Sequence, residues 1–481
     1  MTVNRTFQQP LRFWTFSGTL SLKVSNFSAN LKKERHYMVY DLIVVGAGPA
    51  GLLAAKTSAG KGLKVLLLER KPDPKVFKRS NTCMLVATPG FHGEEVRVEK
   101  KSKKSYAFNF IKSGFSVNYN GPLYKVNDMI SFSPGGFKVH VHNKKEPLYH
   151  LFDNKTLLSE LIDETVKSGV TLRTGALAIK AENKDGSVRI CIREEGGESW
   201  VEGKKAIVAE GLKSRLAQYT GVNSKRKLYG RGPGLQYLMD GIKYPFKEKA
   251  FMTFYGSAYS KGGGLVYIAP SAEGKDCFYV GISGVNPSKY CKIFLDEFIK
   301  NGKFREWFDG AKITESTGAV VHLISPLPVP IAGNILFAAD SVGYAETMYQ
   351  GAFMCGFHAA NGVYDELNGK GGFENYTKFW QSSFKWNITS QAMANYLKIG
   401  FLFPFFSDAE LDYIFGLVDG KTFEGIMDPY ENINGLFEII TRQPEIKLEI
   451  SQKLKIFQKI TMEDIEKMII QKREFAKNSQ S

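Results

Sequence analysis

The stretch Tyr40-Asp-Leu-Ile-Val-Val45-Gly46-Ala-Gly48-Pro-Ala-Gly51 decides the fold. Residues 40–45 form a short apolar run rich in β-branched side chains, which predicts a buried parallel strand. The glycines follow at once, and an apolar helical stretch continues from them to about Ala59. A second apolar run, residues 64–68, predicts the next parallel strand. Strand, glycine turn, helix and strand in this order are the βαβ fingerprint of a dinucleotide-binding fold.

Four positions of this fingerprint have specific tasks. Gly46 makes the tight turn, and Gly48 lets the backbone approach a pyrophosphate held at the helix N-terminus. Gly51 lets the helix pack closely against the strand. Glu69, which directly follows the second strand, is expected to accept hydrogen bonds from a ribose hydroxyl. The expected contacts to the dinucleotide also include Pro49, Ala50 and Arg70.

Composition and charge limit the class of protein. The chain has 481 residues, and its 43% apolar and 23% charged residues are typical of a globular protein. The net charge of +16 predicts an anionic partner, and the motifs favour an anionic lipid surface over nucleic acid. Five cysteines lie far apart without a CxxC pair, which argues against zinc ribbons, iron–sulfur clusters and a dense disulfide framework. We expect no metal site, and no apolar run reaches the roughly 18–20 residues of a spanning helix.

Two later segments are similar to further flavin motifs. Residues 206–215, Ala-Ile-Val-Ala-Glu210-Gly211-Leu-Lys-Ser-Arg, are similar to the strand and Asp-Gly motif of flavoprotein hydroxylases, with a glutamate for the usual aspartate. Residues 333–343 are similar to their Gly-Asp motif, in which Asp340 would hold a ribityl hydroxyl. Ala339 stands there in place of the usual glycine. Gln350-Gly351 then opens a helix whose first amides would face the flavin or its pyrophosphate.

The chain thereby resembles the geranylgeranyl reductase branch of the FAD-dependent, para-hydroxybenzoate hydroxylase-like flavoproteins. The resemblance runs from about Met38 to the C-terminal helices. Cys83 stands where prenyl reductases place a cysteine near the flavin. Residues 265–270, Leu-Val-Tyr267-Ile-Ala-Pro, are similar to an aromatic strand that lines the family's lipid tunnel, although the family has bulkier aromatic residues there. Glu346 stands in a loop where the family has Asn-Pro and several glycines.

The resemblance implies FAD as cofactor and a reductase that saturates C=C bonds in the isoprenoid, geranylgeranyl-type chains of lipids. The proton would come from Cys83, Tyr267 or Glu346, with Cys83 ranked first. We find no second dinucleotide unit, so electrons are expected from an external donor such as a ferredoxin. The FAD contacts implied by the resemblance are Lys155, Glu210, Gly211, Asp340, Gly351 and Ala352.

The expected fold class is α/β. A Rossmann-like FAD domain is interleaved with an antiparallel-sheet substrate domain and followed by a C-terminal helical region. Residues 1–37 are basic and rich in Ser, Thr and Asn, and are expected to be either disordered or outside the native start. The predicted ranges are 38–78, 150–220 and 315–368 for the FAD domain, 79–149 and 221–314 for the substrate domain, and 369–481 for the helical domain.

Two other functions stay open at this point. One is a flavin-dependent monooxygenase of an aromatic or lipid substrate on the same fold. The other is a prenyl-binding module that carries no flavin and performs no reaction. The expected location is the cytoplasm, with peripheral contact to a membrane as a further expectation.

Overall fold

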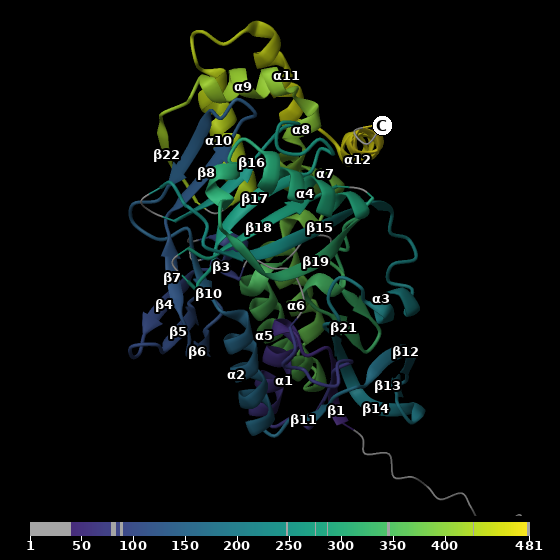
Figure 1. Ribbon diagram of the computed structural model, residues 1–481. Helices are drawn as coiled ribbons and strands as arrows, with labels where there is room; N and C mark the ends of the chain where they lie inside the picture. The colour runs from purple at the N-terminus through teal and green to yellow at the C-terminus, as the bar shows by residue number, and fades with distance from the viewer. Residues whose placement is uncertain are drawn as a thin grey trace, which may run out of the picture. The chain divides into compact units, whose positions relative to one another are not determined.

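Two large β-sheets and a set of C-terminal helices form the described part of the chain (Figure 1). The structure is a computed structural model that describes residues 40–77, 83–86, 90–246, 249–274, 276–285, 287–343, 347–426 and 428–478. The predicted N-terminal extension 1–37 and the candidate proton donor Glu346 therefore lie outside the described residues.

The first sheet contains the dinucleotide-binding unit predicted from the sequence. Strand β1 (Tyr40–Val45) pairs in parallel with β2 (Val65–Leu68) on one side and with the end of β14 (Gly197–Val208) on the other. All but one of the residues of β1 are buried, as expected for a central parallel strand covered on both faces. The remaining strands of this first sheet are β11 (Thr171–Arg173), β13 (Ser187–Glu194), β12 (Leu177–Lys184), β21 (Ile335–Phe337) and β20 (Ile331–Ala332).

Helix α1 (Pro49–Gly60) follows the glycine turn and packs against β1 and β2. Helix α5 (Met348–Leu367) crosses α1 at very short range, because a Cβ atom on Gly356 would lie 2.3 Å from the carbonyl oxygen of Ala50. Helices α2 (Asn154–Lys167) and α6 (Gly372–Ser383) contact α1 and α5 respectively. Glycine at the crossing therefore lets the backbones of α1 and α5 approach each other closely.

The second sheet is mostly antiparallel, as expected for a substrate-binding sheet. One face packs on helix α4 (Lys289–Asn301), and buried aliphatic and aromatic residues fill the space between them. The other face carries the polar side chains of Gln236, Tyr267 and Tyr279. Its strands, in spatial order, are β19 (Lys312–Ile324), β15 (Leu228–Asp240), β18 (Phe278–Ser283), β17 (Leu265–Pro270), β16 (Ala250–Phe254), β8 (Asp128–Phe132), β9 (Lys138–His142) and β22 (Thr422–Glu424).

Two small sheets complete the strands. They are made of β3 (Met84–Val86), β10 (Tyr149–Phe152) and β7 (Leu123–Val126), and of β4 (Val96–Lys100), β5 (Tyr106–Phe110) and β6 (Phe115–Tyr119).

The chain beyond α6 is helical, and its helix starts agree with the sequence signals. Ser407 and Glu410 form a capping box at the start of α9. Thr461 and Asp464 exchange the same pair of hydrogen bonds at the start of α12. Within the described residues, no helix is both long and apolar enough to cross a membrane. The helices are α7 (Ser390–Leu397), α8 (Leu402–Phe405), α9 (Asp408–Gly416), α10 (Pro429–Thr441), α11 (Leu448–Gln458) and α12 (Met462–Asn478).

Strand β22 lies inside the predicted helical region yet pairs in parallel with β9 of the second sheet. The predicted substrate domain ends at residue 314, but β19 of the second sheet continues to Ile324. The α/β fold class is confirmed, whereas the assignment of residue ranges to separate domains stays a prediction.

The crossing of α1 and α5 yields a testable prediction. Gly356→Ala should destabilise the fold by about 1–3 kcal/mol, because the added methyl group meets backbone rather than a mobile side chain. Gly435→Ala is the matched control, since Gly435 lies in α10 with open space around its Cβ position. The control should stabilise by about 1 kcal/mol through helix propensity alone. Urea unfolding of both variants measures the difference, and equal stability of the two would contradict the close crossing.

Candidate active site

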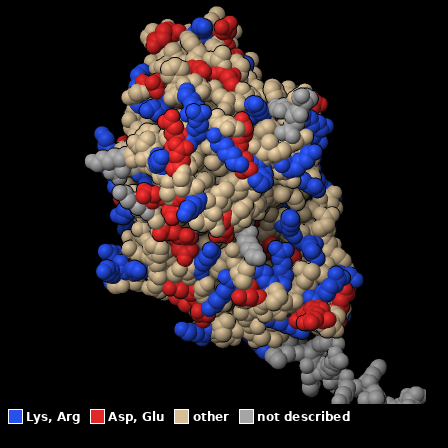
Figure 2. All heavy atoms as spheres, viewed as in Figure 1, with Lys and Arg blue, Asp and Glu red and all other residues tan. Residues whose placement is uncertain are grey.

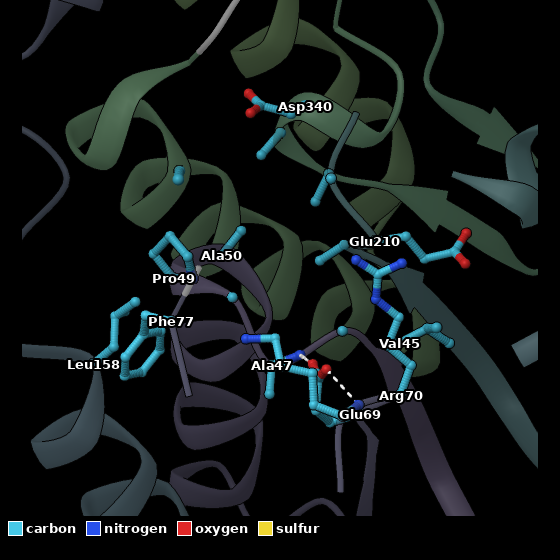
Figure 3. A pocket seen from close by; sticks show the side chains of 18 of the residues that line it. Val45, Ala47, Pro49, Ala50, Glu69, Arg70, Phe77, Leu158, Glu210 and Asp340 are labelled. Atoms are coloured by element: carbon cyan, nitrogen blue, oxygen red, sulfur yellow. Dashed lines mark hydrogen bonds between the residues drawn. The ribbon is translucent and has the colours of Figure 1, made fainter. Parts of the chain in front are cut away.

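A cavity of about 790 Å³ lies at the carboxyl ends of β1, β2, β14 and β21. Open α/β sheets bind their ligands at this edge of the sheet. Figure 3 shows Asp340 at one end of the cavity and Glu69 at the other, with the start of α1 between them. The predicted residues that line the cavity are Gly46, Gly48, Pro49, Ala50, Glu69, Arg70, Cys83, Glu210, Gly211, Asp340 and Ala352.

The glycine turn has the shape that a bound pyrophosphate requires. Gly46 has φ +103°, and a Cβ atom there would lie 2.4 Å from the carbonyl oxygen of Ala209. Gly48 has open space where its Cβ would be, so its backbone faces the cavity without a side chain in between. Gly48 is also the N-cap residue of α1 and has no side chain to cap the first-turn amides. Phosphate oxygens can accept hydrogen bonds from these amides, and the helix dipole stabilises their negative charge.

Glu69 is held by two backbone amides, as the dashed lines in Figure 3 show. Its Oε2 accepts from the amide of Ala47 at 2.8 Å, and its Oε1 accepts from the amide of Lys71 at 2.9 Å. The side chain is buried, so these bonds fix the carboxylate at the cavity wall. A carboxylate oxygen has further lone pairs that can accept from ribose hydroxyls. Glu69 thus links the glycine turn to β2 and can bind the ribose predicted for this position.

Glu210 and Asp340 each tie down the loop that carries them. Glu210 Oε2 accepts from the Ser214 hydroxyl at 2.7 Å and from the Leu216 amide at 3.0 Å. Burial raises the pKa of Glu210, and these two hydrogen bonds oppose the rise. Asp340 Oδ1 accepts from the amide and the hydroxyl of Thr347, at 2.9 and 3.0 Å. Both residues line the cavity, and these hydrogen bonds fix the orientation of each carboxylate.

The backbone next to Asp340 has a conformation that favours glycine, the residue expected there from the motif resemblance. Ala339 has φ +53°, a left-handed conformation that glycine adopts without steric cost. The cavity wall at this turn is therefore built from a strained alanine, which directs the following carboxylate into the cavity.

Among the predicted site residues that the structure describes, four do not line the cavity. Gly51 packs against the carbonyl oxygen of Gly46, and Gly351 packs against the ring of Phe384. Both glycines therefore allow close packing of the segments that form the cavity wall. Lys155 is exposed and forms an ion pair with Glu315 at 3.3 Å, while its neighbour Asn154 faces the cavity.

Tyr267, the fourth of these residues, lies on the second sheet. Its hydroxyl donates to Gln236 Oε1 at 2.8 Å, and its ring occupies the space left by Gly281 on the strand between them. Tyr267 is therefore a residue of the sheet face and lies outside the cavity lining.

Cys83 marks the point where the cavity meets the second sheet. It lines the cavity, and its Sγ lies 3.5 Å from the hydroxyl of Tyr279 on β18. Burial raises the pKa of Cys83 to about 12, against the smaller effect of the Tyr279 hydrogen bond. Burial also raises the pKa of Tyr279 well above its usual range. Both groups are protonated at neutral pH, so each can donate a hydrogen bond or a proton.

Sequence reasoning does not identify Tyr279. The partner of Cys83 follows from how two distant segments meet, which no single stretch of sequence shows. One signal lies in the sequence: Tyr279 and Gly281 alternate along β18 and so share the face that carries Tyr267.

A second cavity of about 970 Å³ adjoins the first. The two share Arg70, Gly211 and Lys213 among their lining residues. The second cavity runs along the edge of the second sheet and past the start of α4, where Lys289 and Lys292 line it. Its cationic side chains favour an anionic occupant.

Comparisons with known proteins agree with this site. A model of the pyridine nucleotide-disulphide oxidoreductase family matches residues 40–232. The digeranylgeranylglycerophospholipid reductase of Methanocaldococcus jannaschii is 27% identical over 413 residues, which cover 85% of this chain and 96% of that protein. The enzyme of the same name from Methanospirillum hungatei is 23% identical over 426 residues, covering 86% and 96%.

A solved structure of a geranylgeranyl bacteriochlorophyll reductase-like protein from Thermoplasma acidophilum superposes with a TM-score of 0.64. It is 18% identical and covers 87% of this chain and 99% of its own, which shows a shared fold.

These matches confirm the class that the sequence predicts, an FAD-dependent oxidoreductase. They also confirm the resemblance to geranylgeranyl reductases. The residues that line the cavity also fit FAD. The start of α1 has no side-chain cap, the carboxylate of Glu69 is fixed at one end, and that of Asp340 is oriented at the other.

Glu69 provides a direct test of this fit. Glu69→Gln should weaken FAD binding about tenfold or more, because the two backbone N–H groups bond to different oxygens and one of them would then face an NH2 donor. Glu315→Gln is the control, since its partner Lys155 lies outside the cavity, and it should leave the dissociation constant within about twofold. Titration calorimetry with FAD gives both values. Unchanged affinity in the Glu69 variant would contradict the assignment.

Proposed function

We propose that this chain is a reductase that saturates C=C bonds in the isoprenoid, geranylgeranyl-type chains of lipids. The observation that carries the proposal is the contact of Cys83 with Tyr279, where the cofactor cavity meets the second sheet. Two relatives named digeranylgeranylglycerophospholipid reductase align over nearly their whole length, which supports this substrate class.

The chain's own residues supply orientation and a proton. FAD, when bound and reduced, supplies the hydride that one alkene carbon needs. The glycine turn, Glu69 and Asp340 would hold the cofactor along the cavity. Cys83 carries a proton at Sγ at neutral pH. It would pass this proton to the second alkene carbon, and the resulting thiolate would take up a proton from water before the next turnover. Tyr279 orients the sulfur through its hydroxyl.

Two further residues, Tyr267 and Glu346, remain candidates for the proton source. Tyr267 lies on the same sheet face as Tyr279, diagonally across β17 and β18, because Tyr267 pairs with Gly281 and Tyr279 with Ala269. Its hydroxyl proton is already donated to Gln236. Glu346 remains a candidate from the resemblance alone and lies outside the described residues.

The proposal also includes two partners, an external electron donor and an anionic membrane surface. The cationic residues Arg70, Lys213, Lys289 and Lys292 around the second cavity would suit an acidic donor protein such as a ferredoxin, or an anionic lipid headgroup. On the face seen in Figure 2, Lys and Arg side chains are interspersed with Asp and Glu over most of the surface. We therefore assign the anionic partner to this cavity rather than to the face seen in Figure 2.

The function is tested with chemically reduced protein under anaerobic conditions. Addition of unsaturated prenyl phospholipids should reoxidise the flavin and raise the lipid mass by about two units per saturated bond. Absence of reoxidation with every prenyl lipid would contradict the reductase. Oxygen uptake with hydroxylation of an added phenol would instead indicate a monooxygenase, and a purified protein that cannot take up FAD would indicate a prenyl-binding module.

Cys83 is tested in the same assay. Cys83→Ala should lower the rate of lipid-dependent reoxidation roughly a hundredfold, because a positioned acid contributes about that much. Tyr279→Phe should lower it less, since it removes orientation and keeps the thiol. Both variants should bind FAD normally, as measured by calorimetry. Cys191→Ala is the matched control, because Cys191 is also buried but lies on β13, outside the cavity lining. A Cys83 variant with full activity would remove this residue from the mechanism.

A further inference from the structure

Two histidines and an aspartate meet on adjacent strands at the end of the second sheet. His140 and His142 alternate along β9 and so lie on the same face of the sheet. Asp128 on β8 is the direct cross-strand partner of His142. The neighbouring pair on this face is His140 with Ile130. The pleat of the sheet therefore places all three polar side chains together.

Both imidazoles converge on one oxygen atom. His140 Nε2 lies 2.6 Å and His142 Nδ1 lies 2.9 Å from Oδ1 of Asp128. The two nitrogens and the carboxylate oxygen all lie within 4.8 Å of one another. Metal–ligand bonds of about 2.0–2.2 Å separate tetrahedral ligand atoms by only a little more than these hydrogen bonds do. A cation can thus replace the shared protons after small side-chain movements.

The surroundings of His140 fit a ligand histidine. Its second nitrogen, Nδ1, lies 3.2 Å from the hydroxyl of Thr422 on β22. With a cation bound at Nε2, the ring hydrogen lies on Nδ1, and Nδ1–H can donate to this hydroxyl. Metal-bound histidines nearly always donate their other N–H in this way, which fixes the tautomer and the ring orientation. The strand pairing that places Thr422 also sets Glu424 opposite His142.

Burial and charge also suit a cation. The side chain of Asp128 is 14% exposed, and those of His140 and His142 are 32% and 29% exposed. The site is therefore shielded yet reachable from solvent. The carboxylates of Asp128 and Glu424 favour positive charge. Lys138, the preceding residue on this face of β9, places its ammonium group over the ring of Phe246 at 5.8 Å.

We propose that Asp128, His140 and His142 form a divalent metal site that binds Zn²⁺. Two neutral imidazoles and one carboxylate are a donor set that suits this ion, and they leave a fourth position for water. The bound ion fastens β8 and β9 together next to β22, the strand that the C-terminal region adds to the sheet. It also neutralises acidic charge at this edge. The proposal does not depend on the reductase function proposed above.

Zinc titration of the full FAD-loaded chain tests the site. Calorimetry should show one Zn²⁺ per chain in the wild type, and His140→Ala with His142→Ala together should weaken that binding at least about a hundredfold. Asp128→Asn should weaken it at least about tenfold, because the charge is lost while the shape is kept. His322→Ala is the matched control, a half-buried histidine on β19 that should leave zinc binding unchanged.

A second measurement on the wild type avoids any dependence on variant folding. X-ray absorption of the zinc-loaded protein should show two imidazole nitrogens and oxygen ligands at about 2.0–2.2 Å. A sulfur ligand shell, equal zinc binding by the double histidine variant, or absence of stoichiometric binding would each overturn the proposal. In that case the three residues form only a hydrogen-bonded cluster.

Discussion

The close approach of three backbone segments at the glycine turn is the constraint on which the rest of the site depends. A Cβ atom on Gly46 would strike the carbonyl of Ala209, and one on Gly51 would lie 1.8 Å from the carbonyl of Gly46. Gly356 brings α5 onto α1 in the same way. Because no side chain fills these gaps, the ends of β1, β14 and α5 surround one cavity, and Glu69 locks the turn from the side.

The same constraint determines where chemistry can occur. The cavity is closed at one end by Glu69 and reaches Asp340 at the other (Figure 3). Its wall also contains Cys83, which contacts the second sheet through Tyr279. Burial keeps both groups neutral, so the junction offers protons without placing a negative charge next to an apolar substrate.

Local signals in the sequence predict much of this site. The βαβ unit, Glu69 and the cavity-lining positions of Asp340 and Ala352 follow from short patterns whose chemistry is local. Lys155 differs, because the resemblance implies an FAD contact there but its side chain turns to Glu315 on the other sheet. Tyr279 and the cluster of Asp128 with His140 depend on strand pairing between distant segments, which no single stretch encodes. The His-x-His alternation in β9 predicts a strand, and only its neighbour on β8 adds the carboxylate.

Hydrogen–deuterium exchange of the chain with and without FAD tests the central claim most directly. Bound FAD should slow the exchange of amides in peptides that cover residues 46–52, because the first-turn amides of α1 then hold the pyrophosphate. Peptides that cover residues 338–343 and 347–352 should also be protected, while those from the C-terminal helices α10 and α11 should not change. Unchanged exchange at residues 46–52 in a chain that demonstrably binds FAD would contradict the account, since the cofactor would then lie elsewhere.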